Sequence, residues 1–310
     1  MNHKLFIIIV LLFPISSVFA QYEHQQDIIY GYKDGMALVM DAFIPTKNPN
    51  GASVVFINSG GMLSNPTRSH RADRIPVINK LIESGFVVFS VSHGSQPKYN
   101  ADEIRYDISR AIRFIKFHAG NFGVDLGRIG IMGRSSGGHL ALMAALAPVP
   151  ADLESSDPVN HESAKVQSVI AYFPSTDLLD FGEENTTIIE HFHTLDYYID
   201  AAFDFHVWDT ATFRFERIAD TVEYREWLQM NSPVSHVTED DPPLLIFHGD
   251  KDVLVPIQQS ELMINKYISL GLDNQFVIAI DKGHGWDIPL ENEFQTVLGW
   301  FGKYLLNNTE

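Results

Sequence analysis

The stretch RIGIMGRSSGGHLALMAAL, residues 128–146, decides the fold. Residues 128–132 form a mostly apolar run typical of a buried strand, and Ser136–Leu146 has the small and aliphatic side chains of a buried helix. Between them lies a Gly-x-Ser-x-Gly motif centred on Ser135. A serine on a sharp strand-to-helix turn exposes its hydroxyl, and the flanking glycines leave room for the turn to close. The stretch therefore predicts that Ser135 is a nucleophile at the end of a strand.

The rest of the chain alternates between strand and helix patterns. Strands are predicted at residues 27–30, 37–43, 52–58, 86–91, 128–132, 166–173, 244–248 and 275–280, and helices at 73–83, 101–117, 136–146, 257–270 and 290–305. The helix at 101–117 carries isoleucine at helical spacing, and Asn100 with Glu103 predicts a capping box at its start. Such alternation implies crossover connections, and therefore an α/β fold with a mostly parallel sheet and helices on both faces.

Two residues far along the chain fit the partners that Ser135 requires. A serine hydroxyl needs a histidine to accept its proton, and the histidine needs an acid to orient it. His284 follows the last predicted strand, and Asp252 follows the strand at 244–248. All three residues therefore lie at carboxyl ends of strands in one parallel sheet, where such sheets place their sites. We expect Ser135 to be the nucleophile, His284 the base and Asp252 the acid.

The chain offers other candidates for the acid and the base. They are Asp250 and Asp281 for the acid, and His139 and His248 for the base. Asp252 is preferred because it lies further into its loop than Asp250 and can reach the histidine there. Asp281 shares the end of the strand before the histidine and ranks third. The two histidines lie one helical turn after the serine and at the end of a strand, so both are interpreted as structural.

The same chemistry requires an oxyanion hole, which is a pair of backbone N–H groups aimed at the developing negative charge. One donor is expected at Ser136, directly after the nucleophile. The other is expected in the loop after the strand at 52–58, where Gly60 and Gly61 let the backbone approach a substrate closely. The alternative interpretation of this pair is an ordinary Gly-Gly turn.

Four segments together resemble the α/β-hydrolase superfamily. They are VVFINSGGM at 54–62, GRSSGGHLA at 133–141, SP at 232–233 with PPLLIFHGDKDVLVP at 242–256, and GHGW at 283–286. The most similar branch holds secreted bacterial acetyl xylan and feruloyl esterase-like proteins, related to the catalytic domains of prolyl oligopeptidases. The resemblance implies the same triad and the same oxyanion glycines. Relatives usually carry His-Gly-Gly-Gly where this chain has Asn58, Ser59, Gly60 and Gly61, so different side chains shape the loop here.

Composition restricts where the protein works and what it binds. The 310 residues include 22 Lys or Arg, 39 Asp or Glu and no cysteine, for a net charge of −17. Cysteine chemistry is therefore excluded, and an acidic chain is a poor match for nucleic acid. Residues 1–20 have the basic start, apolar run and small-residue end of a signal peptide, and no later segment is apolar for long enough to span a membrane. We expect a secreted or periplasmic protein that does not bind a membrane after cleavage, with one domain at residues 21–310.

An insertion at residues 177–230 is predicted to form a helical cap over the nucleophile. Between Asp177 and Trp227 it holds thirteen acids against three arginines, together with eleven Phe, Tyr or Trp side chains. One interpretation is an aromatic-walled pocket that repels anionic substrates, and the other is that the rings pack the cap onto the domain while the acids face solvent. His191, His193 and Asp196 could hold a metal, but a serine triad needs none, so we expect no metal and no cofactor.

The expected function is hydrolysis of carboxylic esters through an acyl-enzyme, with a small-molecule or carbohydrate ester as substrate. One alternative is a peptidase similar to prolyl oligopeptidases, although the chain has no room for the large extra domain that typically restricts access in those enzymes. The other alternative is a non-catalytic binding protein that keeps the fold, since fold alone does not fix function.

Overall fold

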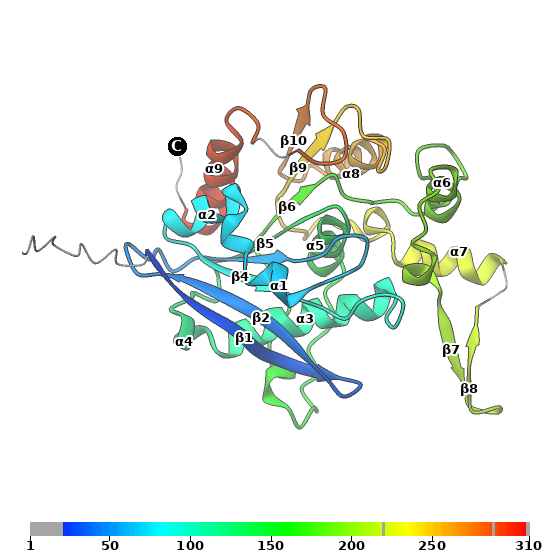
Figure 1. Ribbon diagram of the computed structural model, residues 1–310, viewed down its shortest axis with the longest axis horizontal. Helices are drawn as coiled ribbons and strands as arrows, with labels where there is room; N and C mark the ends of the chain where they lie inside the picture. The colour runs from blue at the N-terminus through cyan, green and yellow to red at the C-terminus, as the bar shows by residue number, and fades with distance from the viewer. Residues whose placement is uncertain (1–20, 219–220, 287–288, 308–310) are drawn as a thin grey trace, which may run out of the picture.

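A single eight-stranded sheet organises the protein (Figure 1). The computed structural model describes residues 21–218, 221–286 and 289–307, so the predicted signal peptide lies outside the described residues. In spatial order the strands are β1 (Tyr22–Lys33), β2 (Met36–Pro45), β4 (Val87–Val91), β3 (Ser53–Ile57), β5 (Ile129–Arg134), β6 (Ser168–Tyr172), β9 (Leu244–Gly249) and β10 (Asn274–Ala279). The first two pairings, β1 with β2 and β2 with β4, are antiparallel, and the rest are parallel.

Helices cover both faces of this sheet, as predicted. On one face lie α2 (Pro76–Glu83) and α9 (Glu293–Leu305), which contact each other and seal a core that includes Val54, Val88 and Met132. The principal helices of the other face are α3 (Ala101–Phe117), α5 (Ser136–Leu146) and α8 (Gln258–Ser269). Short helical turns connect these elements: α1 (Pro66–Ser69), η1 (Ala72–Arg74), α4 (Ala119–Phe122), η2 (Pro158–His161) and η4 (Pro233–His236). The strands β3, β4, β6 and β9 are buried throughout, and β5 is buried up to Gly133, which explains the continuous apolar runs in the sequence.

The predicted elements are present, and their boundaries differ where local chemistry intervenes. The helix at 101–117 has the predicted bounds, and both hydrogen bonds of the capping box between Asn100 and Glu103 are made. The helix predicted from residue 73 is instead a short turn, η1, followed by α2. Pro76 explains the break, because proline favours the first turn of a helix and restricts the residue before it to extended backbone.

The insertion after β6 forms a cap beside the carboxyl ends of the strands (Figure 1). It contains α6 (Ile188–Thr194), η3 (Asp200–Phe203) and α7 (Thr221–Met230), together with an unpredicted hairpin of β7 (His206–Asp209) and β8 (Arg214–Arg217). The two ends of the insertion are tied together, since the Leu178 amide donates to Ser232 Oγ at 2.9 Å and the Val234 amide donates to the Thr176 carbonyl at 3.0 Å. The cap therefore leaves and rejoins the domain at one place.

The aromatic residues of the cap are divided between the core and the surface. Phe192, Phe203 and Phe205 are buried in the core that also packs α3, α5 and α8 against the sheet. The rings of Phe213 and Phe215, on and beside the hairpin, are more than 70% exposed.

Among the described residues, every helix is too short or too polar to cross a bilayer.

Replacement of Asn100 by alanine tests the capping box. The Asn100 side chain accepts from the Glu103 amide at 3.0 Å, and alanine leaves that amide without its partner. We expect the free energy of unfolding to fall by about 1 kcal/mol, measured by urea denaturation. Asn100→Ser keeps an acceptor and should remain close to the wild type. Equal stability of the alanine and serine variants would contradict this account of the helix start.

Candidate active site

Ser135 occupies a strained turn between β5 and α5. Its backbone has φ 54° and ψ −123°, a combination that non-glycine residues rarely adopt. Two glycines make the turn possible, because neighbouring backbone atoms lie so close to them that a side chain would not fit. A Cβ on Gly133 would lie 2.1 Å from the Gly137 carbonyl oxygen, and one on Gly137 would lie 2.7 Å from the Ile57 carbonyl oxygen. The motif therefore has glycine where no side chain fits, and the turn projects Ser135 from the sheet.

The three residues predicted as a triad form one hydrogen-bonded chain. His284 Nε2 lies 2.8 Å from Ser135 Oγ, and His284 Nδ1 lies 2.8 Å from Asp252 Oδ2. The three positions come from the ends of β5, β9 and β10, so the parallel sheet brings them to a common edge. This geometry allows the imidazole to take a proton from the serine while the carboxylate holds the ring.

Asp252 is buried and held in its ionised form. Burial alone would raise the pKa of this carboxyl, but hydrogen bonds from His248 and His284 outweigh burial and lower the pKa to about 2. Its other oxygen, Oδ1, accepts from the amides of Leu254 and Val255 at 3.0 and 2.9 Å. The carboxylate is thus fixed in place by backbone on one side and imidazole on the other.

The rival residues take other positions. His139 is buried beside the Ser175 carbonyl, and burial lowers its pKa to about 4, so it is a neutral structural residue. His248 contacts Ser260 Oγ and the Val255 carbonyl, and its Nε2 lies 3.3 Å from Asp252 Oδ2. His248 therefore supports the acid as well as the fold, a contact that sequence reasoning missed. Asp250 pairs with Lys251 at 3.3 Å instead of with His284.

The structure corrects the expected oxyanion donors in one respect. The Gly60 amide already donates to the Leu63 carbonyl at 3.0 Å, so this N–H is occupied within its own loop. Within the described residues, the amide of Gly61 has no backbone acceptor, and that of Ser136 is at the first position of α5, where no intrahelical acceptor exists. The amides of Gly61 and Ser136 are therefore available to a ligand, whereas the Gly60 amide is used within its own loop.

The side chain of Asn58 anchors this loop. Its buried side-chain amide donates to the Asn65 carbonyl at 2.7 Å and to Ser69 Oγ at 3.0 Å, and Ser69 Oγ lies 2.8 Å from Ser92 Oγ. The next residue, Ser59, lies with its Oγ 3.0 Å from Ser136 Oγ. The two residues that differ from the usual His-Gly pair therefore tie the loop to α1 and to the start of α5.

Two hollows meet at Ser135. One is a small, mostly apolar cavity of about 40 Å³ between Ser135, Met62 and the cap residues Ile188, Phe192 and Phe203. The other is a wide cleft of about 740 Å³ that also reaches His284. Tyr197 of the cap lines both hollows. The predicted aromatic wall is thus present on the small cavity, although most rings of the insertion lie elsewhere.

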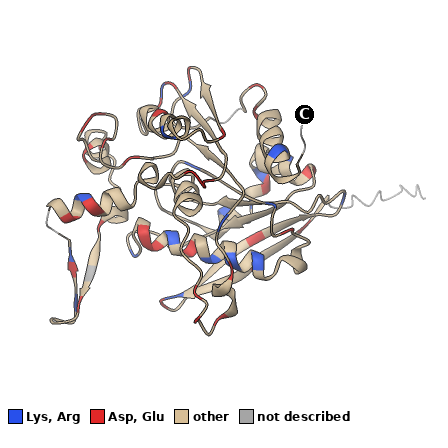
Figure 2. Ribbon diagram, turned by 180° about the vertical axis from the view of Figure 1, so that it is seen from behind, with Lys and Arg blue, Asp and Glu red and all other residues tan. Residues whose placement is uncertain are grey.

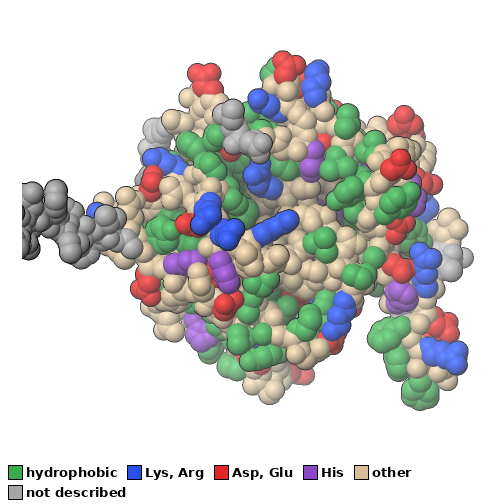
Figure 3. All heavy atoms as spheres, in the orientation of Figure 1, with side chains coloured by type: hydrophobic (Ala, Val, Ile, Leu, Met, Phe, Trp, Pro, Cys, Tyr) green, Lys and Arg blue, Asp and Glu red, His purple; other side chains and the backbone are tan. Residues whose placement is uncertain are grey.

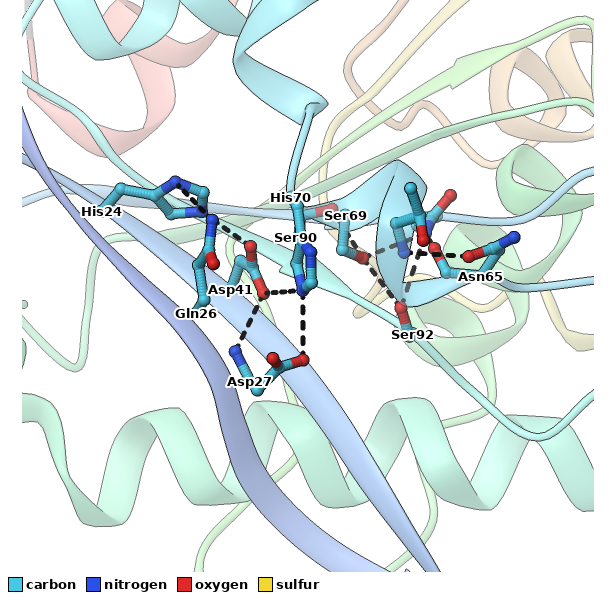
Figure 4. A network of polar contacts seen from close by, with 11 residues as sticks. His24, Gln26, Asp27, Asp41, Asn65, Ser69, His70, Ser90 and Ser92 are labelled. Atoms are coloured by element: carbon cyan, nitrogen blue, oxygen red, sulfur yellow. Dashed lines mark hydrogen bonds and ion pairs between the residues drawn. The ribbon is translucent and has the colours of Figure 1, made fainter.

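The histidines of the cap serve other contacts. His191 lies 3.2 Å from the Val253 carbonyl, and His193 pairs with Asp200 at 2.8 Å. A separate group of side chains with ligating atoms close together lies on β1, β2 and the end of α1, namely Asp27, Asp41 and His70 (Figure 4). There the buried carboxylate of Asp41 accepts from the Asp27 amide at 3.1 Å, so the group ties β1 to β2.

Replacement of Asp252 by asparagine tests the ionised carboxylate. Because its folded pKa of about 2 lies below the ordinary value of 3.8, the charged form stabilises the fold above about pH 4, and this contribution is lost as the pH falls toward 2. We expect the free energy of unfolding of the wild type to exceed that of Asp252→Asn by a constant amount above about pH 5, and this difference to shrink at lower pH. Denaturant titrations at several pH values measure this. A difference that stays unchanged down to low pH would contradict it.

The chain is similar in sequence to curated ester hydrolases. It is 27% identical over 251 residues to the probable carboxylic ester hydrolase LipM of Mycobacterium tuberculosis (strain ATCC 25618 / H37Rv), which covers 80% of this chain and 53% of that protein. Across the first such relatives, the chain spans about half the length of the proteins it matches.

Solved structures show the same fold. A truncated form of a carbohydrate esterase from gut microbiota matches with a TM-score of 0.73 and 22% identity, covering 92% of this chain and 98% of that one. An acetyl ester-xyloside bifunctional hydrolase from Caldicellulosiruptor lactoaceticus matches with a TM-score of 0.69 and 18% identity, covering 90% and 96%. At the level of sequence, the BD-FAE family matches residues 40–267, which is most of the chain. The chain therefore belongs to the BD-FAE family, an esterase family with the α/β-hydrolase fold.

Proposed function

We propose that this protein is a serine hydrolase that cleaves carboxylic esters. The observation that carries the proposal is the chain of two 2.8 Å hydrogen bonds from Ser135 through His284 to Asp252. Family membership and the ester hydrolases among its relatives support the same reaction class. An intact triad on a strained turn disfavours the alternative of a non-catalytic binding protein.

The reaction follows from the positions of these groups. His284 Nε2 accepts the Ser135 proton as Oγ attacks the ester carbonyl, and the ionised Asp252 stabilises the resulting imidazolium. The amides of Gly61 and Ser136 hold the negative charge of the tetrahedral intermediate. The intermediate expels the alcohol, which takes the proton from His284. Water activated by the same imidazole then releases the acid and restores Ser135.

The two hollows divide the substrate into two parts. The small cavity of about 40 Å³ has room for roughly three water molecules, which corresponds to a short acyl group such as acetyl. The open cleft of about 740 Å³ can take a larger alcohol, including a sugar. The carbohydrate-directed names of two structural neighbours are consistent with this assignment. We propose a short-chain acyl esterase that acts on carbohydrate or similar alcohols.

Export is part of the proposal. The apolar run and small-residue end of residues 1–20 support cleavage after Ala20 and a secreted or periplasmic site of action. A carbohydrate ester outside the cytoplasm fits such a location.

Replacement of Ser135 by alanine tests the mechanism. We expect the wild type to hydrolyse p-nitrophenyl acetate and Ser135→Ala to lose about 10³-fold or more of kcat, since the covalent route is removed. Ser136→Ala offers a matched control, because it keeps the backbone amide and removes only a neighbouring hydroxyl. Labelling by a fluorophosphonate probe should likewise require Ser135. Equal rates in wild type and Ser135→Ala would refute the proposal, and cleavage of dipeptide chromophores without ester turnover would favour a peptidase.

The small cavity predicts a limit on acyl length. We expect kcat/KM for p-nitrophenyl octanoate to be roughly tenfold or more below that for the acetate, because extra methylenes overfill the site. Tyr197→Ala removes part of the wall and should raise the octanoate-to-acetate ratio, whereas Tyr198→Ala changes a ring that is 68% exposed and should leave it unchanged. Ratios that are the same in all three proteins would contradict this view of the cavity.

A further inference from the structure

We propose that the open cleft beside Ser135 binds esters whose alcohol part carries a carboxylate, with Arg68 and Arg134 as the recognising cations. The inference rests on the proposed function, since it assigns the leaving-group side of that reaction. It differs from one interpretation of the acidic insertion, in which the pocket repels anionic substrates.

The lining of the cleft is cationic, although the chain as a whole is strongly acidic. Arg68 and Arg134 line it together with His284, and no Asp or Glu does so among the described residues. The net charge of the whole chain is −17. Figure 3 shows several Lys and Arg side chains gathered in the middle of one face, whereas Figure 2 shows acids scattered over many elements.

The two guanidinium groups lie beside different loops of the cleft. A Cβ on Gly60 would lie 3.4 Å from Arg68 Nη1, which places this group against the oxyanion loop. A Cβ on Gly285 would lie 4.0 Å from Arg134 Nη2, which places the second group next to the residue after His284. A leaving alcohol bound in the cleft therefore lies within reach of both cations.

Neither arginine is neutralised by the protein. Arg105, Arg110 and Arg217 each pair with an aspartate, whereas no carboxylate lies within 4.0 Å of Arg68 or Arg134 among the described residues. Arg134 rests over the rings of Tyr172 and Phe173 and donates to the Trp286 carbonyl at 3.4 Å. A guanidinium has five N–H donors, so most of its capacity is open to a ligand.

The acid that shares a hollow with Arg134 is already committed to other partners. Glu293 lines the neighbouring hollow with Arg134 and Arg74, but it is buried. It accepts from Tyr172 Oη at 3.1 Å, from Trp286 Nε1 at 3.0 Å and from the Leu290 amide at 2.9 Å. These bonds hold the carboxylate away from the cleft, so a substrate carboxylate is the anion that the arginines lack.

Charges that line the cleft decide which ligand it binds, because more distant charges are screened. Exposed charges are screened over about 8 Å at physiological salt, so acids elsewhere on the surface contribute little inside the cleft. A guanidinium presents its donors in a fork that matches a carboxylate and forms stronger hydrogen bonds than a neutral donor. Uronic-acid sugars and hydroxybenzoates both supply an alcohol or phenol with such a group.

Matched charged and neutral esters test the assignment. One pair is an O-acetylated methyl glucuronoside and its uronamide, and the other is 4-acetoxybenzoate and 4-acetoxybenzamide. The readout is the ratio of kcat/KM for the acid to that for its amide, measured in the wild type, Arg68→Gln, Arg134→Gln, Arg68→Lys and Lys47→Gln. Lys47 is exposed and outside the cleft, so it controls for the loss of one positive charge.

We expect each glutamine variant to lower this ratio about tenfold in at least one pair, with Arg68→Lys keeping part of it and Lys47→Gln leaving it unchanged. The substrate pair whose ratio falls shows whether the preferred alcohol is a uronic-acid sugar or a hydroxybenzoate. Equal ratios in all proteins, or arginine variants that slow acid and amide alike, would overturn the inference while turnover of the amides keeps the proposed function. Absence of turnover for every ester would instead count against the proposed function itself.

Discussion

The positive-φ backbone of Ser135 is the constraint on which the site depends. The turn exists only because Gly133 and Gly137 let backbone atoms approach where any side chain would collide. The strain is offset by the buried strand before the turn and the buried helix after it, which hold both ends. The same turn places the first amide of α5 beside the hydroxyl, so one feature fixes both the proposed nucleophile and a proposed oxyanion donor.

Much of the fold could be predicted because its signals are local. The apolar runs of β3, β5 and β9 are buried throughout, and a strand buried on both faces has no other pattern to show. The capping box at Asn100 is likewise contained within four residues. The hairpin of the cap was missed because its strands are four residues long and largely exposed, so they lack the alternation that marks a half-buried strand.

The residues of the candidate site also differ in how far the sequence predicts them. Topology alone brings Ser135, Asp252 and His284 together, since a parallel sheet gathers the carboxyl ends of its strands at one edge. The roles of Gly60 and His248 depend on individual contacts, a carbonyl of Leu63 and a carboxylate of Asp252, that no spacing reveals. Arg134 stood inside the serine motif, but whether an arginine is paired is a property of three-dimensional neighbours.

Two hydrogen bonds join the ends of the cap insertion, so the cap can evolve independently of the sheet. A segment that departs and returns at one point can lengthen, shorten or be exchanged without moving the strands beneath it. The part of the protein that lies over Ser135 can therefore change in evolution while the residues of the sheet edge stay the same. In this architecture, the cap insertion can change which substrate fits, while the sheet keeps the reacting side chains in place.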